Sequence, residues 1–281
     1  QAEDGIRDSV ASRGLGDVYK RQIIYGVPFS QPVRAVLWLM LYKQKPFELA
    51  MVNPGSSSEG GSRHPDFLAK FPTGTIPSIE DKETGFVLSE SHAIMCYLCN
   101  KFDWDDLYPK NHEQRAKVDS YLHLHHRNVR EASIGLVAPK VRKDLNFPED
   151  FLRMSQASVD KAFKAIEDGW LSKSRFLVGD ELTIADMSAY VEIGQLQSKF
   201  TNVYDFEAFP NIRRWLEDMS QVTYHDEIHT SLFELGDISI EVPAMEKIIN
   251  ANKKGFLVIQ QQLCLLYTSD AADEGLGVDL G

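Results

Sequence analysis

The pattern of apolar and polar positions divides the chain into two parts of different character. From 23 to 102, apolar runs with strand-like spacing alternate with runs of helical period, which predicts the order β-α-β-α-β-β-α. From 112 to 262 the predicted elements are helices, separated from the first part by an acidic, proline-containing linker at 103–111. We therefore predict an α/β domain followed by an all-helical domain.

A serine stands where the first predicted strand gives way to the first predicted helix. The apolar run 23–25 and a Gly/Pro turn lead to Ser30, and Pro32 lies in the first turn of an apolar segment that reaches about Lys45. This arrangement predicts that Ser30 is the helix N-cap and accepts a hydrogen bond from a free amide. A helix N-terminus also carries unpaired N–H groups and positive charge. The position therefore suits an anion such as a thiolate.

The rest of the first domain is predicted from turns and alternation. Residues 46–52 alternate as a strand, which after the first helix implies a parallel crossover. The segments 75–80 and 86–90 flank a turn and predict a hairpin. We expect Ser91 to cap the helix that follows, at 92–102.

Helices of the second domain are predicted at 112–138 and at about 149–171, with a further helix at 210–219. Another begins after Thr183, where Asp186 stands three residues on and completes a variant of the capping box.

The two ends of the chain differ from the rest. Residues 1–22 have no apolar period and no apolar block of a signal peptide, and 263–281 carries four acidic residues and no basic residue. Both resemble translated sequencing-adapter sequence. We expect both segments to lie outside the fold.

Composition and charge exclude several classes of partner. With 43% hydrophobic and 25% charged residues, the chain has the composition of a soluble globular protein. Its formal charge of -11 disfavours nucleic acid or an anionic membrane surface as a partner. The longest apolar run, 33–41, contains an arginine and is too short to cross a bilayer. Three cysteines cannot form a disulfide framework, which favours a reducing, cytoplasmic location.

Two motifs that suggest redox or metal chemistry have simpler interpretations. Cys96 and Cys99 have C-x-x-C spacing but lie in the middle of a predicted apolar helix, where a thiolate gains no support from a helix N-terminus. His123 and His126 share a helix face with no acidic or cysteine partner at ligand spacing. We interpret the cysteines as core residues and predict no metal site.

Four motifs in order resemble those of soluble glutathione transferases, nearest to the theta class and its plant-type members. They are Ser-Gln-Pro-x-Arg-Ala at 30–35, Ile-Pro at 76–77, Glu-Ser-His-Ala-Ile at 90–94 and Phe-Leu-x-Gly-x-x-x-Thr-Ile-Ala-Asp at 176–186. The resemblance covers about residues 23–235. It implies a thioredoxin-like first domain, with Pro77 in a cis peptide bond, and an all-helical second domain that holds the electrophile.

The resemblance also assigns roles to individual residues, with glutathione as co-substrate. Ser30 matches the theta-type serine that donates a hydrogen bond to the glutathione sulfur, and Arg130 matches an arginine that adds positive charge near that sulfur. Ile76, before Pro77, matches the residue whose backbone pairs with the cysteinyl part. Glu90 and Ser91 match the pair that holds the γ-glutamyl amine and carboxylate.

Three positions near the site leave questions open. Thr75 stands where the family often has lysine, and Ser62 where it has histidine or glutamine at the glycyl end; Arg63 or His64 is a candidate replacement. Tyr25 is a rival thiol donor, because other transferase classes use a tyrosine near the end of this strand. We rank it below Ser30, since it falls within the predicted strand.

The predicted activity is attack by the glutathione thiolate on an electrophilic carbon or a peroxide, in a homodimer. The alternative is a noncatalytic transferase-like module that binds ligands or proteins. A thiol-disulfide oxidoreductase is disfavoured, because the position of Ser30 would then carry cysteine.

Overall fold

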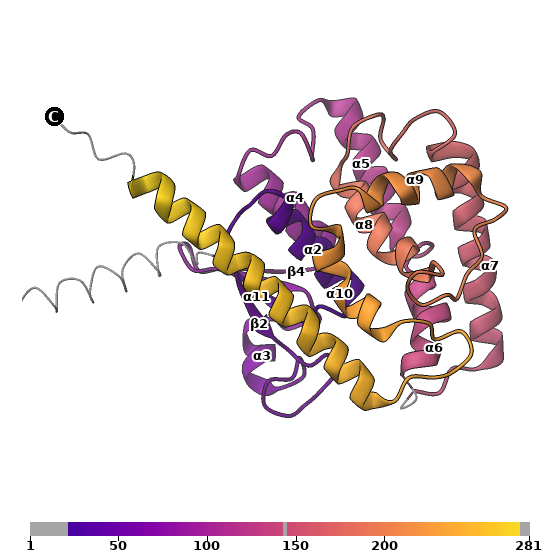
Figure 1. The fold of residues 1–281 in the computed structure, drawn as a ribbon, viewed down its shortest axis with the longest axis horizontal. Helices are drawn as coiled ribbons and strands as arrows, with labels where there is room; N and C mark the ends of the chain where they lie inside the picture. The colour runs from indigo at the N-terminus through magenta and orange to yellow at the C-terminus, as the bar shows by residue number, and fades with distance from the viewer. Residues whose placement is uncertain (1–21, 143–144, 276–281) are drawn as a thin grey trace, which may run out of the picture.

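The first part of the chain forms one mixed four-stranded sheet with helices against it (Figure 1). The computed structural model describes residues 22–142 and 145–275. The strands are β1 (Gln22–Gly26), β2 (Glu48–Met51), β3 (Ser78–Asp81) and β4 (Phe86–Ser89), in the spatial order β2-β1-β3-β4. The helices are α2 (Gln31–Tyr42), α3 (Pro65–Lys70) and α4 (Ser91–Lys101). β1 and β2 are parallel, and β3 is antiparallel to both β1 and β4, so the predicted order and hairpin are confirmed.

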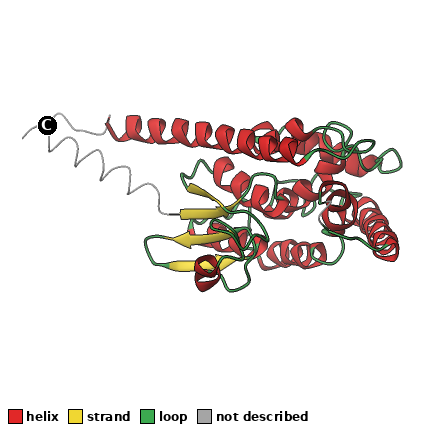
Figure 2. Cartoon of the chain, turned by 90° about the horizontal axis from the view of Figure 1, so that it is seen from below, coloured by secondary structure: helices red, strands yellow, loops and turns green. Residues whose placement is uncertain are grey.

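The second part of the chain is helical, as predicted. Its helices are α5 (His112–His125), α6 (Ala138–Val141), α7 (Glu149–Ala165), α8 (Ile184–Ile193), α9 (Pro210–Ser220), α10 (His225–Leu235) and α11 (Met245–Gly275). Two π-helical segments, Ala132–Val137 and Ile166–Trp170, follow α5 and α7. Figure 2 shows the strands at one end of the molecule and the helices filling the rest.

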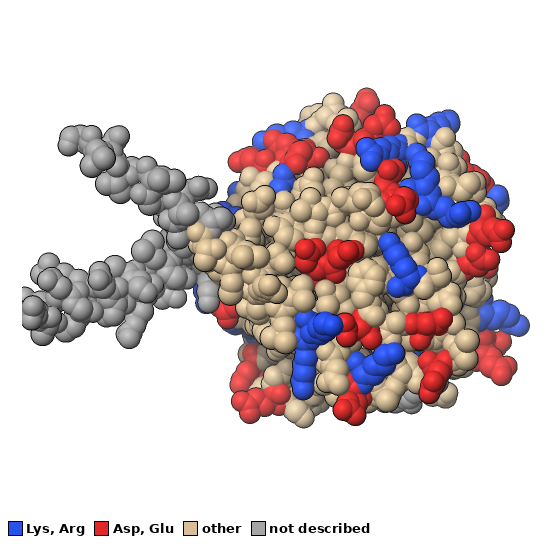
Figure 3. All heavy atoms as spheres, viewed as in Figure 1, with Lys and Arg blue, Asp and Glu red and all other residues tan. Residues whose placement is uncertain are grey.

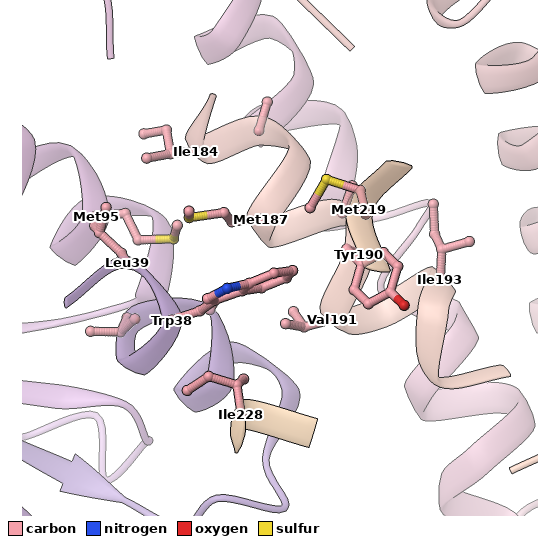
Figure 4. Close-up of a cluster of buried hydrophobic side chains, with 14 of the residues drawn as sticks. Trp38, Leu39, Met95, Ile184, Met187, Tyr190, Val191, Ile193, Met219 and Ile228 are labelled. Atoms are coloured by element: carbon pink, nitrogen blue, oxygen red, sulfur yellow. The ribbon is translucent and has the colours of Figure 1, made fainter. Parts of the chain in front are cut away.

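The two parts share one hydrophobic core. Every residue of α2 from Val33 to Leu41 is buried, as is every residue of α8, because each helix is packed on several sides. Figure 4 shows Trp38 of α2 pointing toward Met187 and Tyr190 of α8. The Trp38 indole N–H also donates to the carbonyl of Thr223 at 2.8 Å. α2 therefore connects the sheet with the helical domain and places its own N-terminus between them.

The capping box before α8 is confirmed. The Thr183 hydroxyl accepts from the amide of Ala185, and the Asp186 carboxylate accepts from the amides of Thr183 and Leu177 at 3.1 and 2.8 Å. The Trp215 indole donates to the same carboxylate at 3.0 Å. This cap joins the loop at 177, the start of α8 and α9.

Two local predictions are wrong in detail. The predicted helix at 112–138 is interrupted, since α5 ends at His125 and five residues in turns precede the π-helical segment. The interruption places Arg130 in a turn, where its direction does not follow the period of α5. In α4, Glu90 and not Ser91 is the N-cap, and Ser91 is the first helical residue.

The largest correction concerns the C-terminal segment. α11 continues past residue 262, and Leu263 and Leu266 are only 2% and 6% exposed. Tyr267 donates its hydroxyl proton to the carbonyl of Phe47 at 3.3 Å. The expectation that 263–281 lies outside the fold is therefore wrong for 263–267, whose apolar residues continue the helical period set by Ile259. Gln22, which the expectation assigned to the N-terminal segment, is buried in β1, so the expectation is wrong for this residue too. Residues 268–275 continue α11. Residues 1–21 and 276–281 lie outside the described residues, and for them the expectation stays a prediction.

Charged side chains are spread over the surface seen in Figure 3, as the proportion of charged residues leads one to expect. Figure 3 shows basic and acidic side chains interspersed on the face crossed by α11. Within residues 22–142 and 145–275, no helix has the length and apolarity that a membrane span requires.

Candidate active site

Ser30 lies at the N-cap of α2, as predicted, with φ -72° and ψ 125°. The predicted capping bond is absent, however: within the described residues the Ser30 hydroxyl makes no hydrogen bond. The residue lines a cavity of about 710 Å³, which we call the large cavity. Its hydroxyl is therefore available to a ligand at the N-terminus of a long buried helix.

The turn that precedes Ser30 is held from three helices. The Arg34 guanidinium donates to the carbonyl of Phe29 at 2.6 Å and to that of Pro28 at 3.4 Å. The hydroxyl of Ser231, on α10, donates to the Pro28 carbonyl at 3.2 Å, and the Phe29 amide donates to Oδ1 of Asn252, on α11, at 3.0 Å. These contacts fix the direction in which α2 presents its first turn.

The large cavity is mainly apolar. Its apolar lining residues come from the turn before α2, the loop after β2, the segments 134–142 and 145–147, and the start of α11: Val27, Phe29, Pro54, Ile134, Val137, Ala138, Val141, Leu145, Phe147, Met245, Ile248 and Ile249. Ser30, Gln31 and Arg130 supply polar groups beside this lining. The cavity can hold an apolar molecule next to the Ser30 hydroxyl.

A second cavity, the small cavity, has a volume of about 160 Å³ and includes Ile76, Pro77, Glu90, Ser91 and Arg130 among its lining residues. The Ile76-Pro77 peptide bond is cis, as the resemblance implied. No backbone hydrogen bond to Ile76 is present within the part of the chain that the structure describes. The two backbone groups of this residue are therefore open to a peptide-like ligand.

The start of α4 contributes a strained residue and a helix terminus to the small cavity. Glu90 has φ 78°, a left-handed conformation that is uncommon for any residue except glycine. Such strain persists where the surrounding structure holds it and is frequent at binding sites. Ser91 opens the helix and is buried, so the unpaired amides of the first turn and the residue Glu90 both border the small cavity. This pairing suits a ligand that carries an ammonium and a carboxylate together.

Arg130 lines both cavities and belongs to a buried charge cluster. Its Nη1 contacts the carboxylate of Glu192, on α8, and lies 3.5 Å from Oε1 of Gln31. Arg34 is fully buried; burial lowers its pKa to about 9, and the charge of Glu192 opposes that effect. Sequence reasoning missed Glu192, although a carboxylate within the apolar run of α8 is a signal that could have found it.

Three histidines also line the small cavity. Nε2 of His92 lies 2.6 Å from Oγ of Ser188, and the rings of His125 and His126 lie 4.8 and 4.7 Å from the His92 ring. Burial lowers the pKa of His92 to about 3 and that of His125 well below its ordinary value, so both are neutral at pH 7. Among the described residues, no group of three or more His, Cys, Asp or Glu side chains is placed to hold a metal ion.

Tyr25 faces a different part of the molecule. Its hydroxyl donates to Glu80 Oε2 at 2.8 Å and lies 3.4 Å from Nζ of Lys70. Its ring packs edge-on against Phe67 and Phe71, beside a third cavity of about 320 Å³. Burial and the Glu80 carboxylate raise the pKa of the phenol. Tyr25 lines neither the large nor the small cavity, which favours Ser30 as the thiol donor.

The residues predicted for the glycyl end are not brought together. Thr75 lines the small cavity, and its hydroxyl lies 2.9 Å from that of Thr73. Ser62 is buried and accepts a hydrogen bond from the Gly55 amide at 2.9 Å, while Arg63 is exposed. Neither Ser62 nor Arg63 lines the large or the small cavity.

Cys96 and Cys99 both lie on α4 and are not disulfide-bonded. Burial raises the pKa of the Cys96 thiol to about 11 and that of Cys99 further. Neither thiol therefore ionises readily at neutral pH, as expected of core residues.

Comparison with known proteins identifies this architecture. The family model of the glutathione S-transferase N-terminal domain matches residues 24–109, and that of the C-terminal domain matches residues 132–222. Glutathione S-transferase T1 of Arabidopsis thaliana is 30% identical over 223 residues, which are 75% of this chain and 89% of that protein. The chain spans only 37% of the length of two further Arabidopsis relatives, T2 and T3.

Solved structures share this fold. Human glutathione-S-transferase T1-1 in its apo form has a TM-score of 0.67 and 24% identity, covering 86% of this chain and 99% of that one. Human glutathione transferase theta-2, in complex with glutathione and an unknown ligand, has a TM-score of 0.65 and 25% identity, covering 85% and 98%. The chain therefore belongs to the glutathione S-transferase family, with theta-class proteins among its relatives.

Proposed function

We propose that the protein is a glutathione transferase whose two cavities hold the two substrates. The γ-glutamyl end of glutathione occupies the small cavity, with its ammonium on Glu90 and its carboxylate at the α4 N-terminus beside Ser91. The backbone of Ile76 pairs with the cysteinyl part. The thiol then points to Ser30, at the edge of the large cavity.

The observation that carries this proposal is the placement of Arg130 and Ser30. Arg130 lines both cavities, so a ligand that extends from the small to the large cavity passes its guanidinium. Ser30, at the end of that path, has an unengaged hydroxyl within the described residues. One thiol-containing peptide can therefore contact the small cavity and the Ser30 hydroxyl at the same time.

The chemistry requires stabilisation of the thiolate. A free thiol has a pKa of roughly 8.5, and lowering it by about two units requires about 2.7 kcal/mol of selective stabilisation of the anion. A hydrogen bond from Ser30 to the anion contributes about 1.5–3 kcal/mol. The α2 N-terminus and the Arg130 cation add to it.

The large cavity accepts the electrophile. Its apolar lining favours an apolar substrate whose electrophilic atom lies near Ser30. At carbon, the sulfur lone pair forms a C–S bond while the bond to the leaving group breaks. At an organic hydroperoxide, sulfur attacks the terminal oxygen and the O–O bond breaks, which gives a sulfenic acid and, after protonation, the alcohol. A second glutathione thiol then attacks the sulfenic sulfur, forming the disulfide and releasing water.

Two measurements test the proposal. Purified protein should be retained on immobilised glutathione, and ultraviolet titration should show a thiolate of bound glutathione with a pKa clearly below that of free glutathione. Arg130→Ala should raise that thiol pKa, because the variant removes a nearby cation. An unchanged titration curve would show that Arg130 does not act on the sulfur.

A noncatalytic binding module is the second candidate. It is favoured by the positions of Ser62 and Arg63, which line neither cavity and leave the glycyl carboxylate without the predicted partners. Retention on glutathione without turnover of any aryl halide, alkyl halide, epoxide or hydroperoxide in a panel would support this candidate. Turnover of any one of them would exclude it.

We also propose a homodimer. The edge strand β4 presents Phe86 and Val87, which are 41% and 36% exposed, and the Phe86 ring lies 4.8 Å from that of Tyr97 on α4. An exposed apolar edge favours association with another chain. Light scattering should give the mass of two chains at micromolar concentration, and the mass of one chain would contradict the proposal.

A further inference from the structure

A buried carboxylate on α8 lies behind the two cavities. Glu192 is 1% exposed, and its carboxylate contacts the Arg130 guanidinium and accepts a hydrogen bond from the Ser133 hydroxyl. Gln195 donates through Nε2 to Oγ of Ser133 at 2.6 Å and to the backbone carbonyl of Glu192 at 3.1 Å. Both carboxylate oxygens are therefore engaged.

The same cluster reaches the residue next to Ser30. Oε1 of Gln195 accepts a hydrogen bond from Nε2 of Gln31 at 2.8 Å, and Oε1 of Gln31 lies 3.5 Å from Nη1 of Arg130. Gln31 and Arg130 line the large cavity, whereas Glu192 lines the small one. The contacts thus form one connected path from Glu192 to the wall that carries Ser30.

A carboxylate at this place needs an explanation beyond packing. Burying a charge is costly unless it is paired and hydrogen-bonded, and an apolar side chain would fill the interior of α8 at lower cost. All other residues of this helix are buried as well. The ion-pair partner of Glu192 is Arg130, whose side chain is 30% exposed. Without the Glu192 carboxylate, the Arg130 guanidinium would extend into solvent.

The charges around Glu192 do not balance. Arg130 and the fully buried Arg34 are both cationic, and Arg34 donates its other Nη to the Val191 carbonyl at 3.2 Å, next to Glu192 in the chain. His125 lies with Nε2 4.0 Å from Glu192 and is neutral, because burial lowers its pKa well below its ordinary value. One carboxylate therefore faces two guanidinium groups, and a bound thiolate would supply the second negative charge.

We propose that Glu192 is a positioning residue that holds the Arg130 guanidinium at the wall shared by the two cavities. This inference rests on the proposed function, since the positioned cation acts on the glutathione sulfur. Glu192 itself lines only the small cavity and acts through Arg130.

The test is the thiol pKa of bound glutathione in Glu192→Gln, measured by ultraviolet absorbance of the thiolate. Loss of the negative charge alone would lower this pKa, whereas release of Arg130 into solvent would raise it. We expect a rise of about one pH unit, approaching the value in Arg130→Ala. A fall or an unchanged value would overturn the inference.

A double variant separates positioning from a general loss of packing. In Arg130→Ala, the residue through which Glu192 acts is absent, so adding Glu192→Gln should produce no further rise. A purely structural role predicts the same rise in both backgrounds, and that result would also overturn the inference.

Two further variants complete the design. Glu131→Gln is the control, because it removes a carboxylate that is next to Arg130 in sequence but accepts its hydrogen bond from Ser155, at 2.8 Å. In this variant the thiol pKa of bound glutathione should equal that in the wild type. Glu192→Asp keeps the charge with one methylene less reach and provides the readout if Glu192→Gln does not fold. We expect an intermediate pKa, and a wild-type value would overturn the inference.

The outcome also distinguishes this inference from the proposed function. If wild-type protein binds no glutathione, or binds it with an unshifted thiol, the proposed function fails first. If the wild-type thiol pKa is lowered and Glu192→Gln leaves it lowered, only the role of Glu192 is wrong.

Discussion

The two cavities on either side of Arg130 are built in different ways. The small cavity, about 160 Å³, is lined by a cis peptide, a strained residue and the first turn of α4, all between 75 and 92, closed by side chains from the helical domain. The large cavity, about 710 Å³, is a mainly apolar space between the turn before α2, the loop 53–56, the segments 130–142 and 145–147, and the start of α11. The first presents backbone groups together with the Glu90 carboxylate, whereas the second presents a mainly apolar lining.

Under the proposed function, this difference assigns glutathione binding to the small cavity and the choice of electrophile to the large one. Backbone amides and a helix terminus cannot be removed by a single side-chain substitution, so on the proposed glutathione side we expect large effects from few side chains, chiefly Glu90. The shape of the large cavity, the proposed electrophile side, depends on how helices distant in sequence pack. The following predictions test that separation, in order of decreasing expected effect.

The first prediction concerns the helix that closes the large cavity. A chain ending at Gln262 loses the buried side chains of Leu263 and Leu266, each worth about 1.5–3 kcal/mol, so the free energy of unfolding should fall by about 3 kcal/mol or more. A chain ending at Thr268 is the control and should unfold like the full chain in urea. Equal stability of the two truncated chains would contradict the packing of α11.

The second prediction concerns the small cavity. Glu90→Ala removes the carboxylate proposed to hold the ligand ammonium, an interaction of about 1.5–3 kcal/mol, and should weaken glutathione binding by roughly 10- to 100-fold. Isothermal titration calorimetry measures the effect. Glu80→Gln is the control, because Glu80 pairs with Lys70 at 2.6 Å away from both cavities. Wild-type affinity in Glu90→Ala would mean that the ammonium lies elsewhere.

The third prediction concerns the junction of the two cavities. Ser30→Ala should reduce the conjugation rate by at least about tenfold, the effect of losing about 1.4 kcal/mol of thiolate stabilisation, while glutathione binding changes much less. Because the Ser30 side chain makes no capping bond, the melting temperature should hardly change. Tyr25→Phe should keep most activity. Full activity in Ser30→Ala together with an inactive Tyr25→Phe would reverse the assignment of the thiol donor.

The smallest effect is expected at Asn252. Asn252→Ala removes the acceptor of the Phe29 amide, about 1 kcal/mol, and should change kcat/KM for an apolar electrophile by about fivefold. The dissociation constant of glutathione should remain that of the wild type, since Asn252 lines only the large cavity. A change in glutathione affinity of the same size would show that the two cavities are not independent.

Much of the fold could be predicted because it depends on local patterns. The strand and helix order, the hairpin and the capping box of Thr183 and Asp186 follow from periodicity and turn chemistry over a few residues. The position of Ser30 at the start of α2 follows from its neighbours in the same way. These features require no knowledge of what packs against them.

Predictions that ignored packing went wrong in identifiable places. The apolar period does not reveal the π-helical segment that follows α5, and the adapter-like composition of 263–281 conceals that its first apolar residues belong to α11. In both cases the structure depends on which residues become buried against other helices, and the local sequence does not contain that information.

The sequence by itself therefore determined the order of the elements and the presence of a serine at a helix N-terminus. Only the tertiary structure decided that Tyr25 bonds to Glu80 and Lys70, away from Ser30, and that Arg130 meets Glu192, 62 residues further along the chain. The physical reason is that hydrogen bonds within a turn depend on adjacent residues, whereas a buried ion pair depends on which helices pack together. Such pairing leaves no fixed spacing in the sequence.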